Sequence, residues 1–213
     1  MRSRRTLLRD AKLYLILDRQ VHAYADLFDT ARRAIHAGVD MIQLRDKYGA
    51  AKEILKFSRR LLKLTRQRVL YIINDRVDLA AVSQADGVHL GQEDVPLKAA
   101  RRLIGSGAII GCSCQTYAHA QKAQKEGADY IGLGSVYKTL TKPERSPMDA
   151  ALLAKVIQKI RLPVFAIGGI NLNNISRLKR LGVSRAAVGR AICCAHDVEA
   201  AVRQFKTNIS MRG

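Results

Sequence analysis

Three polar side chains stand at alternate positions near the end of an apolar segment: Gln43, Arg45 and Lys47. Because side chains alternate between the two faces of a β-strand, these three share one face and Ile42 and Leu44 take the other. Arginine offers phosphate a bidentate fork and lysine offers it a point charge. The spacing indicates either a phosphate or pyrophosphate site or a strand end whose charges only meet solvent, and the residues alone leave both open.

Two carboxylates follow the next two apolar segments. Asp75 comes directly after residues 69–74, and Asp94 comes shortly after residues 86–90. On neighbouring parallel strands they would reach the same rim and could share Mg²⁺, which takes one or two protein carboxylates and completes its shell with water and phosphate oxygens. The alternative is that both aspartates cap the helical patterns that follow them.

Polar loops follow the last three apolar segments. Residues 132–143 carry hydroxyls and lysines between two regular elements, and long loops of this kind often act as lids. Gly168-Gly169 and Gly189-Arg190 place glycines where backbone N–H groups can approach an anion. We therefore expect a phosphate cradle at these loops.

The scaffold for these residues must bring many strand ends together. Short apolar runs alternate with amphipathic stretches, as repeated βα units do, and the clearest helical pattern spans residues 50–67. Gly38, Gly127 and Gly182 stand where helices should end. A Rossmann or flavodoxin-like sheet would leave some units unassigned, so the pattern predicts a single α/β domain, a (β/α)₈ TIM barrel. Strands are expected at residues 13–18, 39–45, 69–74, 86–90, 108–113, 129–134, 163–168 and 186–189.

Length and composition favour one domain at residues 13–213, preceded by a basic N-terminal arm at residues 1–12. The 213 residues, 48% of them hydrophobic, are enough for one core. No apolar run approaches the roughly 18 residues of a membrane span or the core of a signal peptide, so we expect a cytoplasmic protein without a membrane partner. The four cysteines are expected to be reduced core thiols. None of the five histidines stands beside a plausible nucleophile, so none is assigned a catalytic role.

The net charge of +19 is the most unusual bulk feature, because a field of one sign attracts polyanions. The basic residues are scattered over the polar faces of the predicted helices, and the chain has no Trp and few other aromatics for base stacking. Nucleic acid is therefore not the expected partner, although a basic nucleic-acid-binding protein is kept as an alternative.

Seven motifs, in their order along the chain, resemble those of the thiamine phosphate synthase family, and the resemblance spans about residues 13–206. The motifs are Gln43-Leu44-Arg45-Asp46-Lys47 and residues 73–80, 86–94, 111–113, 127–132, 139–142 and 166–170. The resemblance implies a barrel enzyme that joins 4-amino-5-hydroxymethyl-2-methylpyrimidine pyrophosphate to 4-methyl-5-(2-hydroxyethyl)thiazole phosphate, with Mg²⁺ as cofactor. It also implies a dissociative mechanism, in which pyrophosphate leaves before the thiazole nitrogen captures a pyrimidine-methyl cation.

The same resemblance implies a role for each residue that matches a family motif. It assigns the pyrimidine pyrophosphate to Gln43, Arg45, Lys47, Asn74 and Lys142, Mg²⁺ to Asp75 and Asp94, the departing pyrophosphate or the pyrimidine amine to Ser113, and the thiazole phosphate to Thr139, Thr141 and Gly169. Arg45, Lys47, Ser113 and Lys142 are the expected catalytic residues.

Two positions depart from the family pattern. Gly189-Arg190 replaces a hydrophobic residue and a serine, which leads to the hypothesis that Arg190 binds the thiazole phosphate directly. Lys138 stands where the family commonly has proline, so the conformation of the lid loop is not fixed by a proline there. The rival within the same fold is a thiazole tautomerase, which has no pyrophosphate to hold, and a homo-oligomer is left open.

Overall fold

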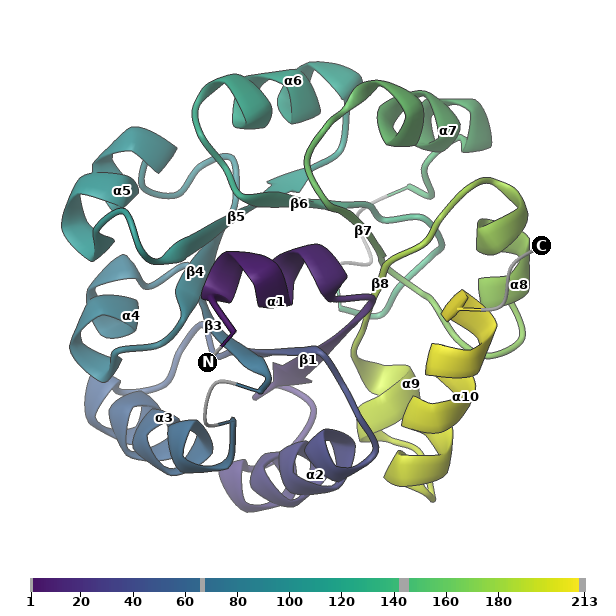
Figure 1. Cartoon of the computed structure of the whole chain (residues 1–213). Coiled ribbons are helices and arrows are strands. Elements are labelled where there is room, and N and C mark those ends of the chain that lie inside the picture. The colour runs from purple at the N-terminus through teal and green to yellow at the C-terminus, as the bar shows by residue number, and fades with distance from the viewer. Residues whose placement is uncertain (1, 66–67, 142–145, 211–213) are drawn as a thin grey trace.

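The computed structural model describes residues 2–65, 68–141 and 146–210 (Figure 1). Within these residues, eight parallel strands close into a barrel in chain order, each hydrogen-bonded to its neighbours, which confirms the predicted (β/α)₈ fold. The strands are β1 (Leu13–Asp18), β2 (Met41–Arg45), β3 (Leu70–Asn74), β4 (Gly87–Leu90), β5 (Ile109–Cys114), β6 (Tyr130–Leu133), β7 (Val164–Ile167) and β8 (Ala186–Val188).

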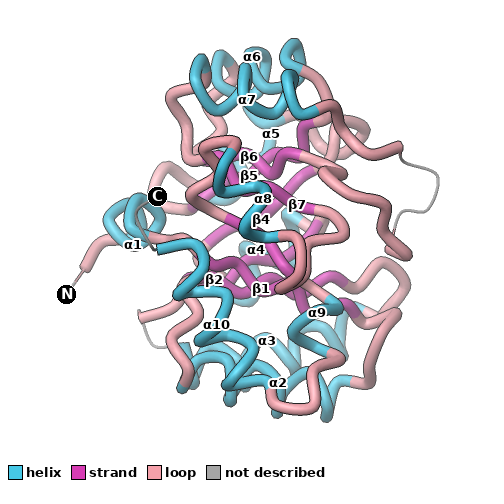
Figure 2. The backbone as a smooth tube through the Cα atoms, turned by 90° about the vertical axis from the view of Figure 1, so that its right-hand side faces the viewer, coloured by secondary structure: helices cyan, strands magenta, loops and turns pink. Residues whose placement is uncertain are grey.

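Helices surround this barrel on the outside, except α1, which lies across one end of it, as the end view in Figure 1 and the side view in Figure 2 show. They are α1 (Arg4–Asp10), α2 (Tyr24–His36), α3 (Ala51–Thr65), α4 (Val77–Ser83), α5 (Leu97–Ile104), α6 (Tyr117–Lys125), α7 (Ala150–Lys159), α8 (Ile175–Arg180), α9 (Arg190–Cys193) and α10 (Val198–Ser210). In α3 the buried residues include Ile54, Phe57 and Leu61, which is the face that the helical spacing predicted. The predicted helix-end glycines do have positive φ, between 87° and 92°.

The alternation of side chains along each strand divides the core into two layers. In β1, Leu15 and Leu17 belong to the cluster that packs under the helices, whereas Tyr14 and Ile16 belong to the cluster inside the barrel. Asp18 ends the inward-facing series, so the last residue of β1 delivers a carboxylate to the rim.

The expected N-terminal arm contains a helix. Helix α1 lies across the N-terminal end of the barrel (Figure 1), where Leu8 and Ala11 join the interior cluster. The Ser3 hydroxyl caps the helix by accepting a hydrogen bond from the Thr6 N–H, and Arg4 Nε donates to Asp86 Oδ1 at 2.7 Å. Residues 4–10 therefore close the barrel floor.

Three aspartates fasten the same end of the barrel. Each precedes an even-numbered strand and accepts backbone N–H groups at the start of the strand before it, so that one carboxylate joins two neighbouring strands. Each carboxylate is also paired with a cation, and the hydrogen bond of that ion pair is charge-assisted at both ends. The pairs are Asp40–Lys206 (2.7 Å), Asp86–Arg4 (2.7 Å) and Asp129–Arg101 (2.5 Å).

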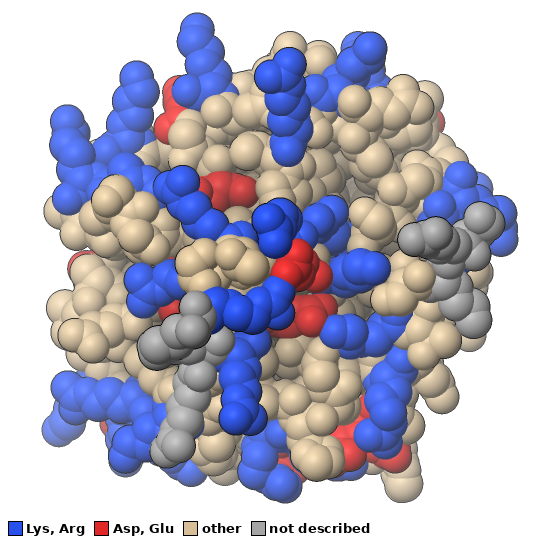
Figure 3. All heavy atoms as spheres, viewed as in Figure 1, with Lys and Arg blue, Asp and Glu red and all other residues tan. Residues whose placement is uncertain are grey.

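The face that carries α1 is strongly basic. Figure 3 shows Lys and Arg side chains spread widely over it, with few acidic side chains between them. The acidic residues there include Asp10, which is paired with Arg2 and Arg9. In the part of the chain that the structure describes, no helix is both long and apolar enough to cross a membrane.

Candidate active site at the C-terminal ends of the strands

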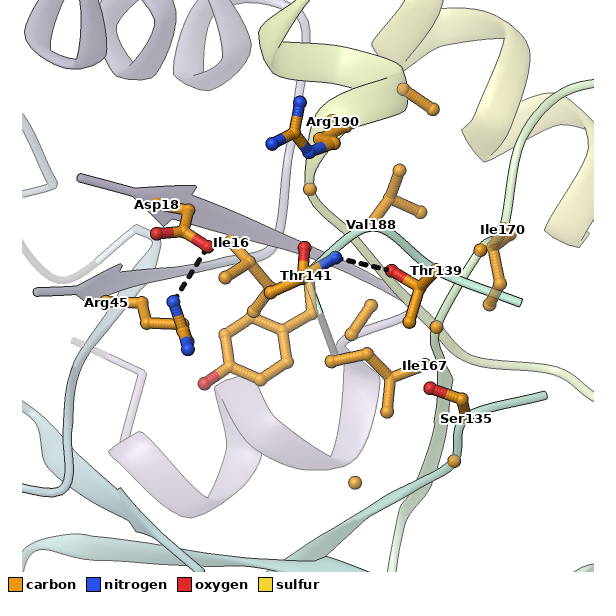
Figure 4. Close-up of a pocket in the computed structure, with 18 of the residues that line it drawn as sticks. Ile16, Asp18, Arg45, Ser135, Thr139, Thr141, Ile167, Ile170, Val188 and Arg190 are labelled. Atoms are coloured by element: carbon orange, nitrogen blue, oxygen red, sulfur yellow. Dashed lines mark hydrogen bonds and ion pairs between the residues drawn. The ribbon is translucent and has the colours of Figure 1, made fainter. Parts of the chain in front are cut away.

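A cavity of about 540 Å³ opens at the C-terminal ends of the strands, the end of the barrel away from α1. Figure 4 shows the Asp18–Arg45 pair on one side of it and Thr139, Ile170 and Ser135 on the other, with Arg190 on α9. The predicted site residues that line the cavity are Gln43, Arg45, Asn74, Ser113, Thr139, Thr141, Gly169, Gly189 and Arg190. Lys47, Asp75 and Asp94 stand outside this lining, and Lys142 lies outside the described residues.

Arg45 is held in place by a carboxylate from the neighbouring strand. Asp18 and Arg45 are register partners in β1 and β2, and the Arg45 Nη1–Asp18 Oδ2 distance is 2.9 Å. Both side chains are nearly buried, at 10% exposure for Arg45 and 7% for Asp18. The same nitrogen donates to Gln20 Oε1 at 2.9 Å, so one corner of the guanidinium is fixed. Asp18 was not among the predicted site residues, although its place in the inward-facing alternation of β1 indicates it.

Lys47 stands beside Asp75, one of the two predicted metal ligands. Its Nζ lies 3.4 Å from Asp75 Oδ2. The loop that presents Lys47 is anchored by the buried Asp46, which accepts hydrogen bonds from the Tyr24 hydroxyl (2.6 Å) and from the Gly49 N–H (2.8 Å). Because β2 ends at Arg45, Lys47 reaches the rim from the loop after the strand and not through strand alternation, and Asp46 anchors that loop.

Asp75 and Asp94 face one another. Burial and the neighbouring Asp94 carboxyl raise the pKa of Asp75, and Lys47 opposes that rise. Neither aspartate caps the following helix, because the N-cap residue is Arg76 for α4 and Pro96 for α5, so the capping alternative is wrong. Asp75 also adopts a left-handed backbone conformation, with φ of 60°, which is uncommon for a residue other than glycine and is often found at functional sites.

This carboxylate pair suits a hard divalent cation. Two like charges held close together destabilise each other, and a cation between them would remove that repulsion. Asp94 Oδ2 already accepts the Gly91 N–H at 2.6 Å, which fixes one of the two carboxylates. Mg²⁺ commonly takes only one or two protein carboxylates and completes its shell with water and phosphate oxygens, so two aspartates are enough for it. Within the described ranges, no group of three or more His, Cys, Asp or Glu side chains is placed to hold a metal.

The two glycines after β7 let the loop after β6 pack closely. A Cβ on Gly169 would lie 2.3 Å from the Lys138 carbonyl oxygen, and one on Gly168 would lie 2.5 Å from Ser135 Oγ. Both glycines have positive φ, 103° for Gly168 and 64° for Gly169. Only glycine tolerates both the close contact and the positive φ, so the Gly-Gly pair lets the loop that carries Thr139 and Thr141 pack against the cavity.

His89 is a site residue that the sequence analysis set aside. Its imidazole is buried, and its Nε2 lies 2.9 Å from the Ser113 Oγ that lines the cavity. The prediction that no histidine has a catalytic role stays a prediction, but His89 does contact a side chain of the predicted site. The two residues lie 24 positions apart in the sequence, and only the pairing of β4 with β5 reveals their contact.

The cysteines follow the prediction with one exception. All four are free, and Cys112, Cys114 and Cys193 are buried. Cys194 is exposed, lines the cavity and has its sulfur 3.5 Å from His22 Nε2, so it is not a core thiol. It follows the short helix α9, which turns it out of the core.

Comparison with known proteins agrees with this geometry. The chain matches the thiamine monophosphate synthase family over residues 13–192. The thiamine-phosphate synthase of Prochlorococcus marinus (strain MIT 9313) is 44% identical over 206 residues, which cover 96% of this chain and 58% of that protein. The thiamine-phosphate synthase of Fusobacterium nucleatum is 36% identical over 204 residues, which cover 95% of this chain and 99% of that protein.

Among solved structures, the thiamine phosphate pyrophosphorylase from Pyrococcus furiosus superimposes with a TM-score of 0.85 at 35% identity, covering 96% of both chains. The chain spans little more than half the length of the Prochlorococcus relative and nearly the whole length of the Fusobacterium and Pyrococcus ones. The match covers all eight strands and the rim residues described above. The chain therefore belongs to the thiamine monophosphate synthase family.

Proposed function

We propose that the chain is a thiamine phosphate synthase, which joins 4-amino-5-hydroxymethyl-2-methylpyrimidine pyrophosphate to 4-methyl-5-(2-hydroxyethyl)thiazole phosphate and releases pyrophosphate. The observation that carries this proposal is the convergence of Arg45, Lys47 and the Asp75–Asp94 pair on one rim, beside a cavity large enough for small phosphorylated molecules. Lys47 beside a carboxylate pair, with Arg45 at the end of β2 on the same rim, suits a pyrophosphate that carries a divalent metal.

The proposed reaction needs stabilisation of a leaving group more than it needs a base. The bond between the pyrimidine methylene carbon and the pyrophosphate oxygen breaks, and its electron pair leaves with the pyrophosphate. The thiazole nitrogen then supplies the electron pair for the new C–N bond, so no proton has to be removed. Arg45, fixed by Asp18, and Lys47 would stabilise the negative charge that develops on the departing oxygen, and preorganised cations do this without reorganisation during the step.

Mg²⁺ is the proposed cofactor, and Asp75 and Asp94 are the residues that would hold it. Bound there, it would neutralise pyrophosphate oxygens and so help the pyrophosphate to leave. Asn74, the last residue of β3, and Lys142 are proposed as further contacts of the pyrimidine pyrophosphate, and Asn74 lines the cavity. Ser113 would hold the pyrimidine amine or the departing pyrophosphate.

The thiazole phosphate is assigned to the opposite side of the cavity. Thr139, Thr141 and Gly169 line that side, and the Thr141 N–H donates to Thr139 Oγ1 at 3.3 Å within the loop. Arg190 lines the same cavity from α9 and supplies a cation beside the Gly189 backbone. We assign Arg190 a direct contact with this phosphate, where the family pattern has a serine.

The test is to mix the purified chain with both substrates and Mg²⁺ and to measure pyrophosphate and thiamine phosphate. We expect both products with Mg²⁺ and neither with EDTA. Thiazole isomerisation without release of pyrophosphate would support the tautomerase alternative. Turnover that EDTA leaves unchanged would remove Asp75 and Asp94 from the proposed metal site.

A further inference from the structure

A continuous line of polar side chains crosses the interior of the barrel at the floor of the cavity, which Tyr14 and His89 also line. Gln43 Nε2 donates to the Tyr14 hydroxyl at 2.6 Å, and the Tyr14 and Tyr130 hydroxyls lie 2.8 Å apart. The Tyr130 hydroxyl lies 3.0 Å from His89 Nδ1, and His89 Nε2 lies 2.9 Å from Ser113 Oγ. The two ends of this line, Gln43 on β2 and Ser113 on β5, both line the cavity.

The surrounding barrel has space for this line because two of its positions are glycines. A Cβ on Gly111 would lie 2.2 Å from the Tyr130 ring and 2.5 Å from His89 Nδ1, where no real side chain could stand. A Cβ on Gly132 would lie 3.2 Å from His89 Cε1. The Tyr14 and Tyr130 rings also pack edge to face, with centroids 5.8 Å apart, so apolar contacts hold the hydroxyls in register.

Counting hydrogens along the line restricts what each group can do. Burial raises the pKa of both Tyr14 and Tyr130, so each hydroxyl keeps its single hydrogen. If Gln43 donates to Tyr14, then Tyr14 must donate to Tyr130 and Tyr130 to His89 Nδ1. His89 then carries its hydrogen on Nε2, and this N–H donates a hydrogen bond to Ser113 Oγ.

The two ends of the line therefore offer a ligand opposite hydrogen-bonding roles, one as acceptor and one as donor. With Gln43 donating inward, its amide oxygen is left to accept from a ligand, while the Ser113 hydroxyl is left to donate to one. Turning the Gln43 amide over reverses every bond in the line and exchanges the two roles. The coupling requires a single proton on the His89 imidazole. A doubly protonated imidazole would donate to both Tyr130 and Ser113, and the Gln43 amide nitrogen and the Ser113 hydroxyl would then both be donors toward a ligand.

We propose that His89 is a positioning residue that couples the hydrogen-bonding character of Gln43 to that of Ser113, so that the cavity offers a bound aminopyrimidine one acceptor and one donor. This inference rests on the proposed function. An aminopyrimidine presents a complementary pair, an exocyclic amine that donates and a ring nitrogen that accepts. The thiazole phosphate, on the other side of the cavity, does not need this pairing.

The discriminating variant is Tyr130→Phe. Tyr130 is fully buried and does not line the cavity, so the change removes one oxygen from the line without touching a substrate. We expect the KM for the pyrimidine pyrophosphate to rise about tenfold, as for a lost buried hydrogen bond, while the KM for the thiazole phosphate stays the same. The matched control is Tyr71→Phe, because Tyr71 is equally buried but bonds Ser58 outside the line, at 2.7 Å.

A second measurement is independent of turnover. Nitrogen-15 NMR of histidine-labelled protein, with the His89 signals identified by their loss in His89→Asn, reports which imidazole nitrogens carry protons. We expect one protonated and one unprotonated nitrogen in the unmodified chain at neutral pH, and a changed tautomer ratio in Tyr130→Phe. Tyr71→Phe should leave the His89 signals unchanged.

The outcomes separate this inference from the proposed function. A chain that releases no pyrophosphate would refute the synthase assignment, whereas the NMR measurement would still test the state of His89. An active chain in which Tyr130→Phe matches Tyr71→Phe in both KM values would overturn the inference. So would a doubly protonated His89 in the unmodified chain, even if Tyr130→Phe failed to fold.

Discussion

The buried pair of Arg45 and Asp18 permits a test that separates stability from catalysis. In Arg45→Met the apolar side chain retains much of the bulk, but Asp18, at 7% exposure, is left as an unpaired carboxylate. Breaking a buried pair in this way costs about 3–5 kcal/mol of unfolding free energy. We also expect kcat to fall about 10²- to 10³-fold, as for the loss of one preorganised donor to a developing negative charge.

The companion variant carries both Arg45→Met and Asp18→Asn. Because the asparagine is uncharged, the double variant should recover most of the lost unfolding free energy in chemical denaturation, yet its kcat should stay as low as that of the single variant. The rate of pyrophosphate release at saturating substrate measures kcat. If activity returned together with stability, Arg45 would only support the fold, and the reasoning about the leaving group would be refuted.

Three other changes test separate parts of the molecule. Arg190→Ala should raise the KM for the thiazole phosphate about tenfold or more, the cost of one charge-assisted hydrogen bond, and an unchanged KM would remove Arg190 from the site. Asp75→Asn should raise the Mg²⁺ concentration needed for half-maximal activity. Because the pKa of Asp75 is raised and metal binds the deprotonated carboxylate, the Mg²⁺ concentration that the unmodified chain requires should rise as the pH falls. If Asp75→Asn showed the same pH dependence, this would count against Asp75 as a ligand. Asp86→Ala should lower the unfolding free energy by about 2 kcal/mol through its lost bonds to Arg4 and Tyr71, with both KM values unchanged, since it lies at the opposite end of the barrel.

The fold could be predicted from the sequence because each βα unit carries its own local signal. Apolar runs set the strands, and glycines of positive φ set several helix ends. Helix α1 was harder to predict, because its basic residues obscure the two leucines that face the barrel interior. Short polar segments of this kind acquire their structure from what they cover.

The site was predictable where a motif lies on one strand. Gln43 and Arg45 follow from alternation along β2, and both line the cavity. The contacts of Asp18 with Arg45 and of His89 with Ser113 depend on register between strands, which local sequence does not specify. Helix capping by Asp75 could likewise be excluded only from the observed cap residue of α4.

The most direct test of the central claim compares the unmodified chain with Arg45→Met in a single assay that quantifies both products. With both substrates and Mg²⁺, we predict equimolar pyrophosphate and thiamine phosphate from the unmodified chain, and a loss of both in the variant at the same protein concentration. Equal product from the two proteins would contradict the claim that cations on this rim drive departure of the leaving group.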